Sequence, residues 1–104
     1  MKFTNNTVIG NTGAQVGGVY IERLYQESSF SNNTISNNSC TDSNYTPGVY
    51  IGYAEGNPSF SFKNNLITGN FSPSSGDTKS RTIYINNSTN ILDAVFSGNS
   101  IQDN

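Results

Sequence analysis

The chain of 104 residues suits one small domain, and its composition excludes several functional classes. Apolar residues make up 33% and charged residues 12%, both low for a globular domain, while Asn, Ser and Thr are abundant. The net charge of −2, with no basic cluster, argues against nucleic acid as a partner. The absence of His excludes His-based acid–base catalysis, the Ser-His-Asp triad and His-ligated metal sites.

The chain has no segment typical of membrane insertion or secretion. No apolar run approaches the roughly 20 residues of a membrane span, and the first ten residues, MKFTNNTVIG, lack the apolar core of a signal peptide. The single Cys40 cannot form an internal disulfide and is expected to be a small, partly buried residue. Six Tyr and six Phe among so few apolar residues favour a repetitive fold with a thin core over a disordered chain.

Two short elements recur in a fixed order along the chain. The pattern F-x-x-N-x-[VI]-x-x-N occurs four times, as FTNNTVIGN at 3–11, FSNNTISNN at 30–38, FKNNLITGN at 62–70 and FSGNSIQDN at 96–104. Between the copies lie GVYI at 18–21, GVYI at 48–51 and TIYI at 82–85. Internal recurrence of this kind is the signature of a repeat architecture.

The repeated elements have the spacing of strands. In the GVYI element, Val19 and Ile21 are apolar at positions i and i+2, which is the period of a strand with one buried face. Gly, Pro, Asn, Asp and Ser fill the links, as in turns. Short strands that recur every 27 to 34 residues predict an all-β fold, a right-handed parallel β-helix of three to four coils that spans residues 1–104 as one segment.

Stacked coils place equivalent residues about 4.8 Å apart, so like residues should form columns. Four inner apolar columns are predicted: Phe3, Phe30, Phe62 and Phe96; Val8, Ile35, Ile67 and Ile101; Val19, Val49 and Ile83; and Ile21, Ile51 and Ile85. A fifth column consists of Asn6, Asn33, Asn65 and Asn99. Asn tolerates the left-handed backbone of a sharp bend, and its amide can both donate and accept along a ladder. A second ladder is expected at Asn11, Asn38, Asn70 and Asn104.

The ends of such a solenoid expose unpaired strand edges, which natural proteins usually cover. Neither end of the sequence resembles a cap, since the chain starts almost on one repeat and stops on the last Asn of another. We therefore expect a piece of a longer β-helix, flanked by further coils, or ends that stack on other chains.

The repeat resembles that of a known family. F-x-x-N at Phe30–Asn33, together with Gly17, Gly18 and Val19 as GG-[aliphatic], is similar to the repeat pair of the polymorphic membrane protein type of chlamydial surface protein. More broadly, the chain resembles right-handed parallel β-helices of the pectin-lyase-like fold, which carry internal Asn ladders. That resemblance implies a fold shared by adhesins, autotransporter passenger domains, lyases, hydrolases and epimerases. GG occurs once, and other residues replace it in the later coils.

The densest charged segment, at 75–81, is the candidate for metal-assisted chemistry. Asp77, Lys79 and Arg81 lie there, and Asp42 lies in the equivalent loop one coil earlier. Asp42 and Asp77 could approach each other and hold Ca²⁺, although calcium takes six to eight oxygen ligands and the sequence names only two carboxylates. Solvated loop charges are the alternative, and no catalytic residue is predicted.

Tyr20, Tyr50 and Tyr84 lie between inward residues, so they should point outward and stack as an exposed column. Exposed aromatic residues on a flat sheet bind sugar rings, or they stack on one another and stabilise the sheet, and both alternatives stay open. The motif N-x-[ST] occurs at Asn5, Asn32, Asn37, Asn44, Asn70, Asn86 and Asn87, a density that an Asn-rich chain can reach by chance. Asn5 and Asn32 should face solvent.

These observations favour a non-catalytic repeat segment of an extracellular or surface-displayed protein, a scaffold that binds glycans or other cell-surface ligands. One alternative is the inner coils of a polysaccharide-active enzyme, whose catalytic groups lie elsewhere. Another is a self-assembling filament unit.

Overall fold

The computed structural model describes residues 1–42, 46–72, 82–86 and 93–104, and every regular element in them is a β-strand. The strands of the first two coils are β1 (Lys2–Thr4), β2 (Thr7–Ile9), β3 (Thr12–Gly13), β4 (Val19–Leu24), β5 (Ser28–Ser31), β6 (Thr34–Ser36), β7 (Ser39–Cys40) and β8 (Val49–Ala54). Those that follow are β9 (Ser59–Lys63), β10 (Leu66–Thr68), β11 (Ile83–Ile85), β12 (Asp93–Ser97) and β13 (Ser100–Gln102). In this part of the chain, no helix is long and apolar enough to cross a membrane.

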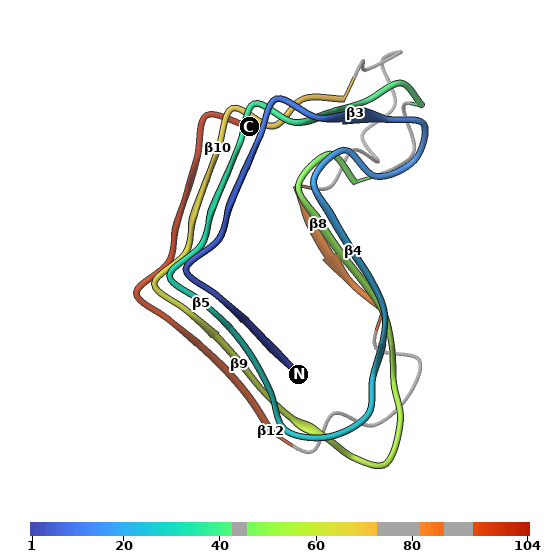
Figure 1. Cartoon of the computed structure of the whole chain (residues 1–104), viewed down its shortest axis with the longest axis vertical. Coiled ribbons are helices and arrows are strands. Elements are labelled where there is room, and N and C mark those ends of the chain that lie inside the picture. Colours follow the sequence, from blue (N-terminus) through green and yellow to red (C-terminus); the bar gives the residue numbers. More distant parts are fainter. Residues whose placement is uncertain (43–45, 73–81, 87–92) are drawn as a thin grey trace.

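The strands form four parallel sheets, in which neighbours come from successive coils. The orders are β1-β5-β9-β12, β2-β6-β10-β13, β4-β8-β11 and β3-β7. Figure 1 looks along the stack, where the traces of successive coils overlie one another around a common interior. The chain is therefore a parallel β-solenoid of three to four coils, as the repeat predicts.

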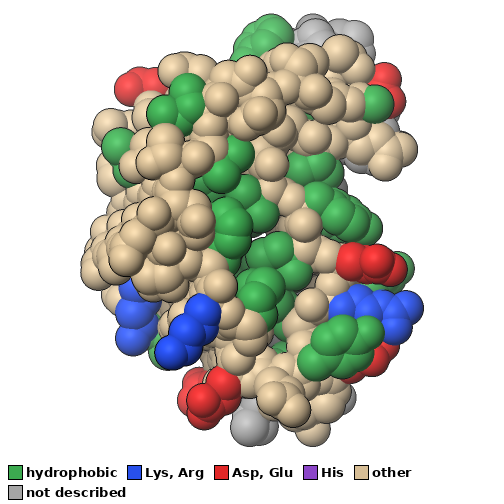
Figure 2. All heavy atoms as spheres, in the orientation of Figure 1, with side chains coloured by type: hydrophobic (Ala, Val, Ile, Leu, Met, Phe, Trp, Pro, Cys, Tyr) green, Lys and Arg blue, Asp and Glu red, His purple; other side chains and the backbone are tan. Residues whose placement is uncertain are grey.

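The register of the sheets aligns each copy of the repeat with the next. Phe30 lies opposite Phe3 and Phe62, and Phe96 lies opposite Phe62. The other columns align in the same way: Val8, Ile35, Ile67 and Ile101; Val19, Val49 and Ile83; and Ile21, Ile51 and Ile85. Figure 2 shows hydrophobic side chains gathered in the middle of the coil and polar side chains around them.

Burial follows position in the stack more than residue type. Phe30 and Phe62 in the middle coils are completely buried, whereas Phe96 in the fourth coil is 51% exposed and Ile101 is 52% exposed. The prediction that Phe96 and Ile101 lie inside is therefore wrong for burial, although their register is right, because no described coil covers them. Phe3 and Val8 in the first coil are partly buried. The others divide into buried Ile35, Ile67, Val19, Val49 and Ile51, and partly buried Ile21, Ile83 and Ile85.

The core also contains residues outside the repeated elements. Leu24 pairs with Ala54, and both are buried near the ends of β4 and β8. Phe60 is buried beside Phe62, with ring centroids 6.1 Å apart. These side chains fill the corner of the coil that the sequence pattern leaves unassigned.

Both asparagine ladders form. In the first, Nδ2 of Asn33 donates to Oδ1 of Asn65 at 2.9 Å and to the carbonyl of Phe3 at 2.9 Å. Asn65 repeats this pattern and joins the coil before it to the coil after it, while Asn6 donates forward to Asn33 and Asn99 donates back to Phe62. The second ladder runs through Asn11, Asn38, Asn70 and Asn104 with the same geometry. Every buried side-chain nitrogen and oxygen in the described residues has a hydrogen-bond partner. These hydrogen bonds offset the desolvation cost of placing amides in the interior.

The bend itself is made by a different residue from the predicted one. At the ladder corners, the positive φ angle belongs to the residue just before each ladder Asn, such as Asn32 at 55° and Asn64 at 54°, and not to Asn33 or Asn65. The other residues that precede a ladder Asn and have a positive φ are Asn5, Gly10, Asn37, Gly69, Gly98 and Asp103. One residue turns the chain, and the next can then point its amide inward along the stack.

Glycines before the Val-Tyr-Ile element allow the coils to approach closely. A Cβ on Gly18 would lie 2.4 Å from the carbonyl oxygen of Gly48, and one on Gly48 would lie 2.3 Å from that of Thr82. Thr82 stands at the same position in the third coil, which no described strand follows in that sheet. Glycine before the Val-Tyr-Ile element is thus required where another coil packs against that position.

Gly48→Ala should lower the free energy of unfolding by about 1–3 kcal/mol, because the new methyl group forces two coils apart. Thr82→Ala, at the equivalent position, should change it by less than about 0.5 kcal/mol. Urea unfolding of both variants measures the difference. Equal effects of the two substitutions would show that coil contact does not select glycine here.

Candidate functional site

The outer face of the β4-β8-β11 sheet carries the predicted tyrosine column. The ring centroids of Tyr20 and Tyr50 are 5.2 Å apart with planes at 18°, and those of Tyr50 and Tyr84 are 5.1 Å apart with planes at 33°. Tyr20 is 58% exposed, while Tyr50 and Tyr84 are intermediate. The structure therefore brings the three predicted residues together as one outward column.

Stacking has a consequence for ligand binding. Tyr50 has a ring neighbour on each side, so both faces of its ring are directed at other tyrosines. A sugar ring binds an aromatic side chain through the flat face. The geometry therefore gives Tyr50 a role in packing the sheet, and leaves its ring edge and hydroxyl group for solvent.

A second aromatic group, which the sequence pattern did not single out, lies at the end of the same sheet. Tyr53 is 44% exposed and pairs across the sheet with Arg23, and Tyr25 is 58% exposed. Among the described residues, no ring contact involves Tyr25 or Tyr53. Nη1 of Arg23 lies 3.1 Å from the Glu55 carboxylate and 3.4 Å from the Tyr25 hydroxyl. We call Arg23, Tyr25, Tyr53 and Glu55 the tyrosine–arginine patch.

The environment of Tyr50 alters its ionisation. Partial burial raises the pKa of the Tyr50 hydroxyl above its usual value of 10.0, and the neighbouring Tyr84, Tyr20 and Tyr53 raise it further. Since the folded state keeps the Tyr50 proton at a pH where an unfolded tyrosine loses it, this contribution to stability is present below pH 10. It is lost as pH rises through the folded pKa.

Alkaline titration of the folded protein should therefore give the Tyr50 hydroxyl a midpoint above 10.0. The difference between the ultraviolet phenolate titrations of the wild type and Tyr50→Phe isolates this group, and thermal unfolding at rising pH checks the loss of stability. A Tyr50 midpoint at or below 10 would contradict the stacked, partly desolvated arrangement.

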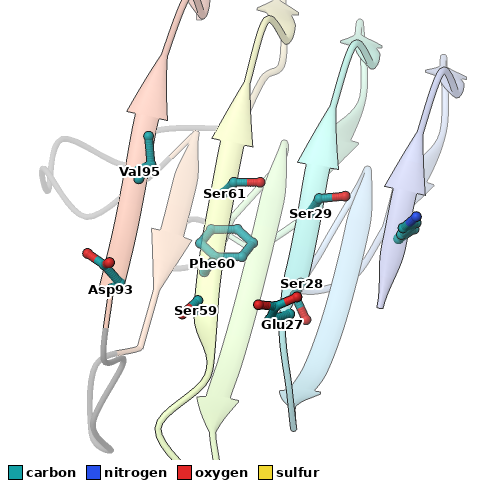
Figure 3. A pocket seen from close by; sticks show the side chains of 9 residues that line it. Glu27, Ser28, Ser29, Ser59, Phe60, Ser61, Asp93 and Val95 are labelled. Carbon is teal, nitrogen blue, oxygen red and sulfur yellow. The ribbon is translucent and has the colours of Figure 1, made fainter.

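A groove of 300 Å³ crosses the outer side of β5, β9 and β12 (Figure 3). Its lining includes two acidic residues, Glu27 and Asp93, with Ser59 opposite Asp93 in the sheet register. Because Ser28 pairs with Phe60, Glu27 lies beside Ser59 on the coil before it. The remaining lining residues are Lys2, Ser28, Ser29, Phe60, Ser61 and Val95. The groove combines hydroxyl groups, both signs of charge and a small apolar surface.

Only one member of the predicted calcium pair, Asp42, lies within the described residues. Asp42 is exposed, and its backbone makes hydrogen bonds within the described residues: its N–H donates to the Ala14 carbonyl, and its carbonyl accepts from the Ser72 hydroxyl. Asp77, with Lys79 and Arg81, lies outside the described residues. Within the described ranges, no three His, Cys, Asp or Glu side chains are grouped to hold a metal ion. Cys40, expected to be partly buried, is fully buried and donates to the Asp42 carbonyl.

The glycosylation motifs differ in access. Asn5, Asn32 and Asn37 are exposed, as expected for the first two, because each is the turn residue before a ladder Asn. Asn70 is only 2% exposed and its amide is engaged in the second ladder, so this motif is blocked in the folded state. Asn86 has intermediate exposure, and Asn44 and Asn87 lie outside the described residues.

The coil architecture and its internal ladders define the chain as a parallel β-solenoid protein. Comparison with known proteins gives no match among family models, curated proteins or solved structures.

Proposed function

We propose that the chain is a non-catalytic repeat segment of an extracellular or surface-displayed β-helix protein, a rigid scaffold that carries a binding face. The repeated residues support this proposal because they are used in coil-to-coil contacts: the Phe, aliphatic and Asn columns all lie along the stack. Apart from the tyrosine column, several outward positions differ from coil to coil, as Arg23 and Tyr53 do, and these positions can vary with a ligand. The resemblance of F-x-x-N and GG-V to the repeats of bacterial surface proteins favours the same class.

The tyrosine–arginine patch is the observation that carries a binding role. Exposed Tyr and Arg side chains dominate the energetics of recognition surfaces, and tyrosine combines an apolar face with a polar tip. Tyr53 and Tyr25 supply aromatic faces without ring partners in the described residues, and the Arg23–Glu55 pair supplies a donor and an acceptor beside them. A glycan at a cell surface fits this combination, since a sugar ring offers C–H groups to an aromatic face and hydroxyl groups to charged side chains.

A glycan array probed with the wild type and two matched variants tests the proposal. The variant Tyr25→Ser/Tyr53→Ser should lose binding by at least about tenfold, whereas Tyr50→Ser should retain most of it, because both faces of the Tyr50 ring are directed at other tyrosines. Equal losses of glycan binding in both variants would indicate that the tyrosine column belongs to the binding site. Absence of binding by the wild type to every glycan would reject the glycan role.

A second candidate, a polysaccharide-active enzyme, rests on the groove of Figure 3. Glu27 and Asp93 lie on coils two strand spacings apart, roughly 10 Å along the stack. Inverting glycoside hydrolases hold their two carboxyl groups about 6.5–9.5 Å apart. The separation of Glu27 and Asp93 along the stack is close to that range. Cleavage of a polysaccharide by the wild type that disappears in both Glu27→Gln and Asp93→Asn would support this candidate. Cleavage that survives either substitution, or that the wild type lacks, would reject it.

A further inference from the structure

The arginine of the tyrosine–arginine patch is already paired with acidic side chains. Nη1 of Arg23 lies 3.1 Å from Oε1 of Glu55, and Nε lies 3.8 Å from Oε1 of Glu22. Nη1 also donates to the Tyr25 hydroxyl at 3.4 Å. One guanidinium and two carboxylates give these three charged residues a formal charge of −1. Arg23 is the one Lys or Arg on β4, β8 and β11, so no other cation on these strands offsets that charge.

The two carboxylates are not held equally. The Glu55 carboxylate accepts a hydrogen bond from Arg23, whereas the contact of Glu22 with Arg23, at 3.8 Å, is too long for a hydrogen bond. The Glu22 side chain is also 65% exposed. Glu22 therefore presents a carboxylate that can accept from a ligand, while Glu55 holds Arg23 in place.

An acidic ligand meets an unfavourable field at this patch. Its carboxylate would approach Glu22 and compete with Glu55 for Arg23, and like charges side by side disfavour a complex. The whole chain does not compensate, since its net charge is −2. The patch therefore selects against glycans that carry carboxylates, because a charge mismatch excludes them.

The aromatic residues of the patch favour a cation. Tyr53 lies beside Arg23 in the register of β4 and β8 and is 44% exposed, and Tyr25 is 58% exposed. The negative face of an aromatic ring attracts an ammonium group. The same face packs against the C–H groups of a sugar ring. An amino sugar uses both interactions, since its ammonium group is attached directly to the ring.

We propose that the tyrosine–arginine patch selects glycans with free amino groups, such as a glucosamine oligomer, over N-acetylated and acidic glycans. This inference rests on the proposed glycan-binding role of the patch and specifies the class of its ligand. The sugar ammonium binds the Glu22 carboxylate, and the sugar ring lies against Tyr53 or Tyr25. Arg23, which Glu55 holds in place, donates to a sugar hydroxyl group.

Isothermal titration calorimetry with tetramers of glucosamine, N-acetylglucosamine and galacturonic acid tests this selectivity. At about pH 5.5 the glucosamine amines are protonated and glutamate side chains are ionised. The glucosamine tetramer should bind at least about tenfold more tightly than the N-acetylated tetramer, and added salt should weaken its binding. The galacturonate tetramer should bind most weakly. A tetralysine peptide, which carries the charge without the sugar rings, should bind at least about tenfold more weakly than the glucosamine tetramer.

Two substitutions of equal charge locate the site. Glu22→Gln should weaken binding of the glucosamine tetramer at least about fivefold and leave the N-acetylated tetramer within about twofold. Asp103→Asn is the matched control, because it removes one negative charge at an exposed residue outside the patch. Asn tolerates the φ of 53° at this position, so the control should bind the glucosamine tetramer within about twofold of the wild type.

Several results would overturn the amino-sugar assignment without bearing on whether the patch binds other glycans. These results are equal binding of the glucosamine and N-acetylated tetramers, tighter binding of the galacturonate tetramer, and tetralysine that binds as tightly as the glucosamine tetramer. Wild-type affinity of Glu22→Gln for the glucosamine tetramer would overturn it as well. Absence of binding to every tetramer also overturns the assignment, and the glycan array then decides the broader role separately.

Discussion

Asn65→Ala should lower the free energy of unfolding by at least about 3 kcal/mol, a large part of the stability of a small domain. The Asn65 side chain is 1% exposed. Its Oδ1 accepts from the backbone N–H and Nδ2 of Asn33, and its Nδ2 donates to the Phe30 carbonyl and to Asn99 Oδ1. Alanine leaves these partners in an interior from which water is excluded, so the cost is that of unsatisfied buried groups.

The neighbouring Asn64→Gly is the matched control. Asn64 is exposed and has a φ of 54°, a conformation that glycine adopts without strain, so the substitution should cost less than about 1 kcal/mol. Urea or thermal unfolding of both variants gives the comparison. If the two unfold at the same midpoint, the ladder does not stabilise the solenoid, and the Asn residues would be no more than turn formers.

Phe62→Ala should cost about 3–5 kcal/mol, because it opens a cavity in the middle of the aromatic column. Phe62 is fully buried, and its ring centroid lies 4.8 Å from that of Phe30 and 5.5 Å from that of Phe96. Its removal breaks the column between the second and fourth coils.

Phe96→Ala provides the comparison at the same position of the repeat. Phe96 is 51% exposed, so truncation should cost less than half as much as at Phe62. The free energies from urea unfolding of the two variants test this ranking. A Phe96 variant as unstable as the Phe62 variant would contradict the exposed position of the Phe96 side chain.

The columns could be predicted because repetition removes the usual ambiguity of strand register. Once Phe3, Phe30, Phe62 and Phe96 are recognised as equivalent, a parallel sheet has only one alignment in which every buried residue meets its own kind. The same logic gives both ladders. Repetition does not predict how deeply each residue is buried, because equivalent residues can lie in covered or uncovered coils. Phe96 and Ile101 are exposed although their equivalents are buried.

The residue that makes each bend was missed for a physical reason. Asn32 and Asn33 are chemically identical, and only the backbone decides which adopts the left-handed conformation and which points inward. Two copies of the repeat have Gly just before the ladder Asn, at Gly69–Asn70 and Gly98–Asn99. Because glycine has the widest backbone freedom, these copies indicate which residue makes the bend.

The proposed binding face was only partly predictable. Tyr20, Tyr50 and Tyr84 follow from strict alternation, but Glu22 and Arg23 are both exposed, so alternation fails before Leu24 turns inward. Tyr53 and Tyr25 lie beyond that break, where a period of two no longer assigns a side to a residue. What separates Tyr25 and Tyr53 from Tyr50 is ring stacking, which depends on the three-dimensional arrangement of the coils.

The central claim is that like residues of successive coils touch although they are far apart in sequence. Nuclear Overhauser measurements on the isotopically labelled chain test it most directly. The structure predicts contacts between the rings of Phe30 and Phe62, between Ile35 and Ile67, and between the side-chain amides of Asn33 and Asn65, all in one folded state. A spectrum with contacts only between near neighbours in sequence, and none between these pairs, would contradict the solenoid.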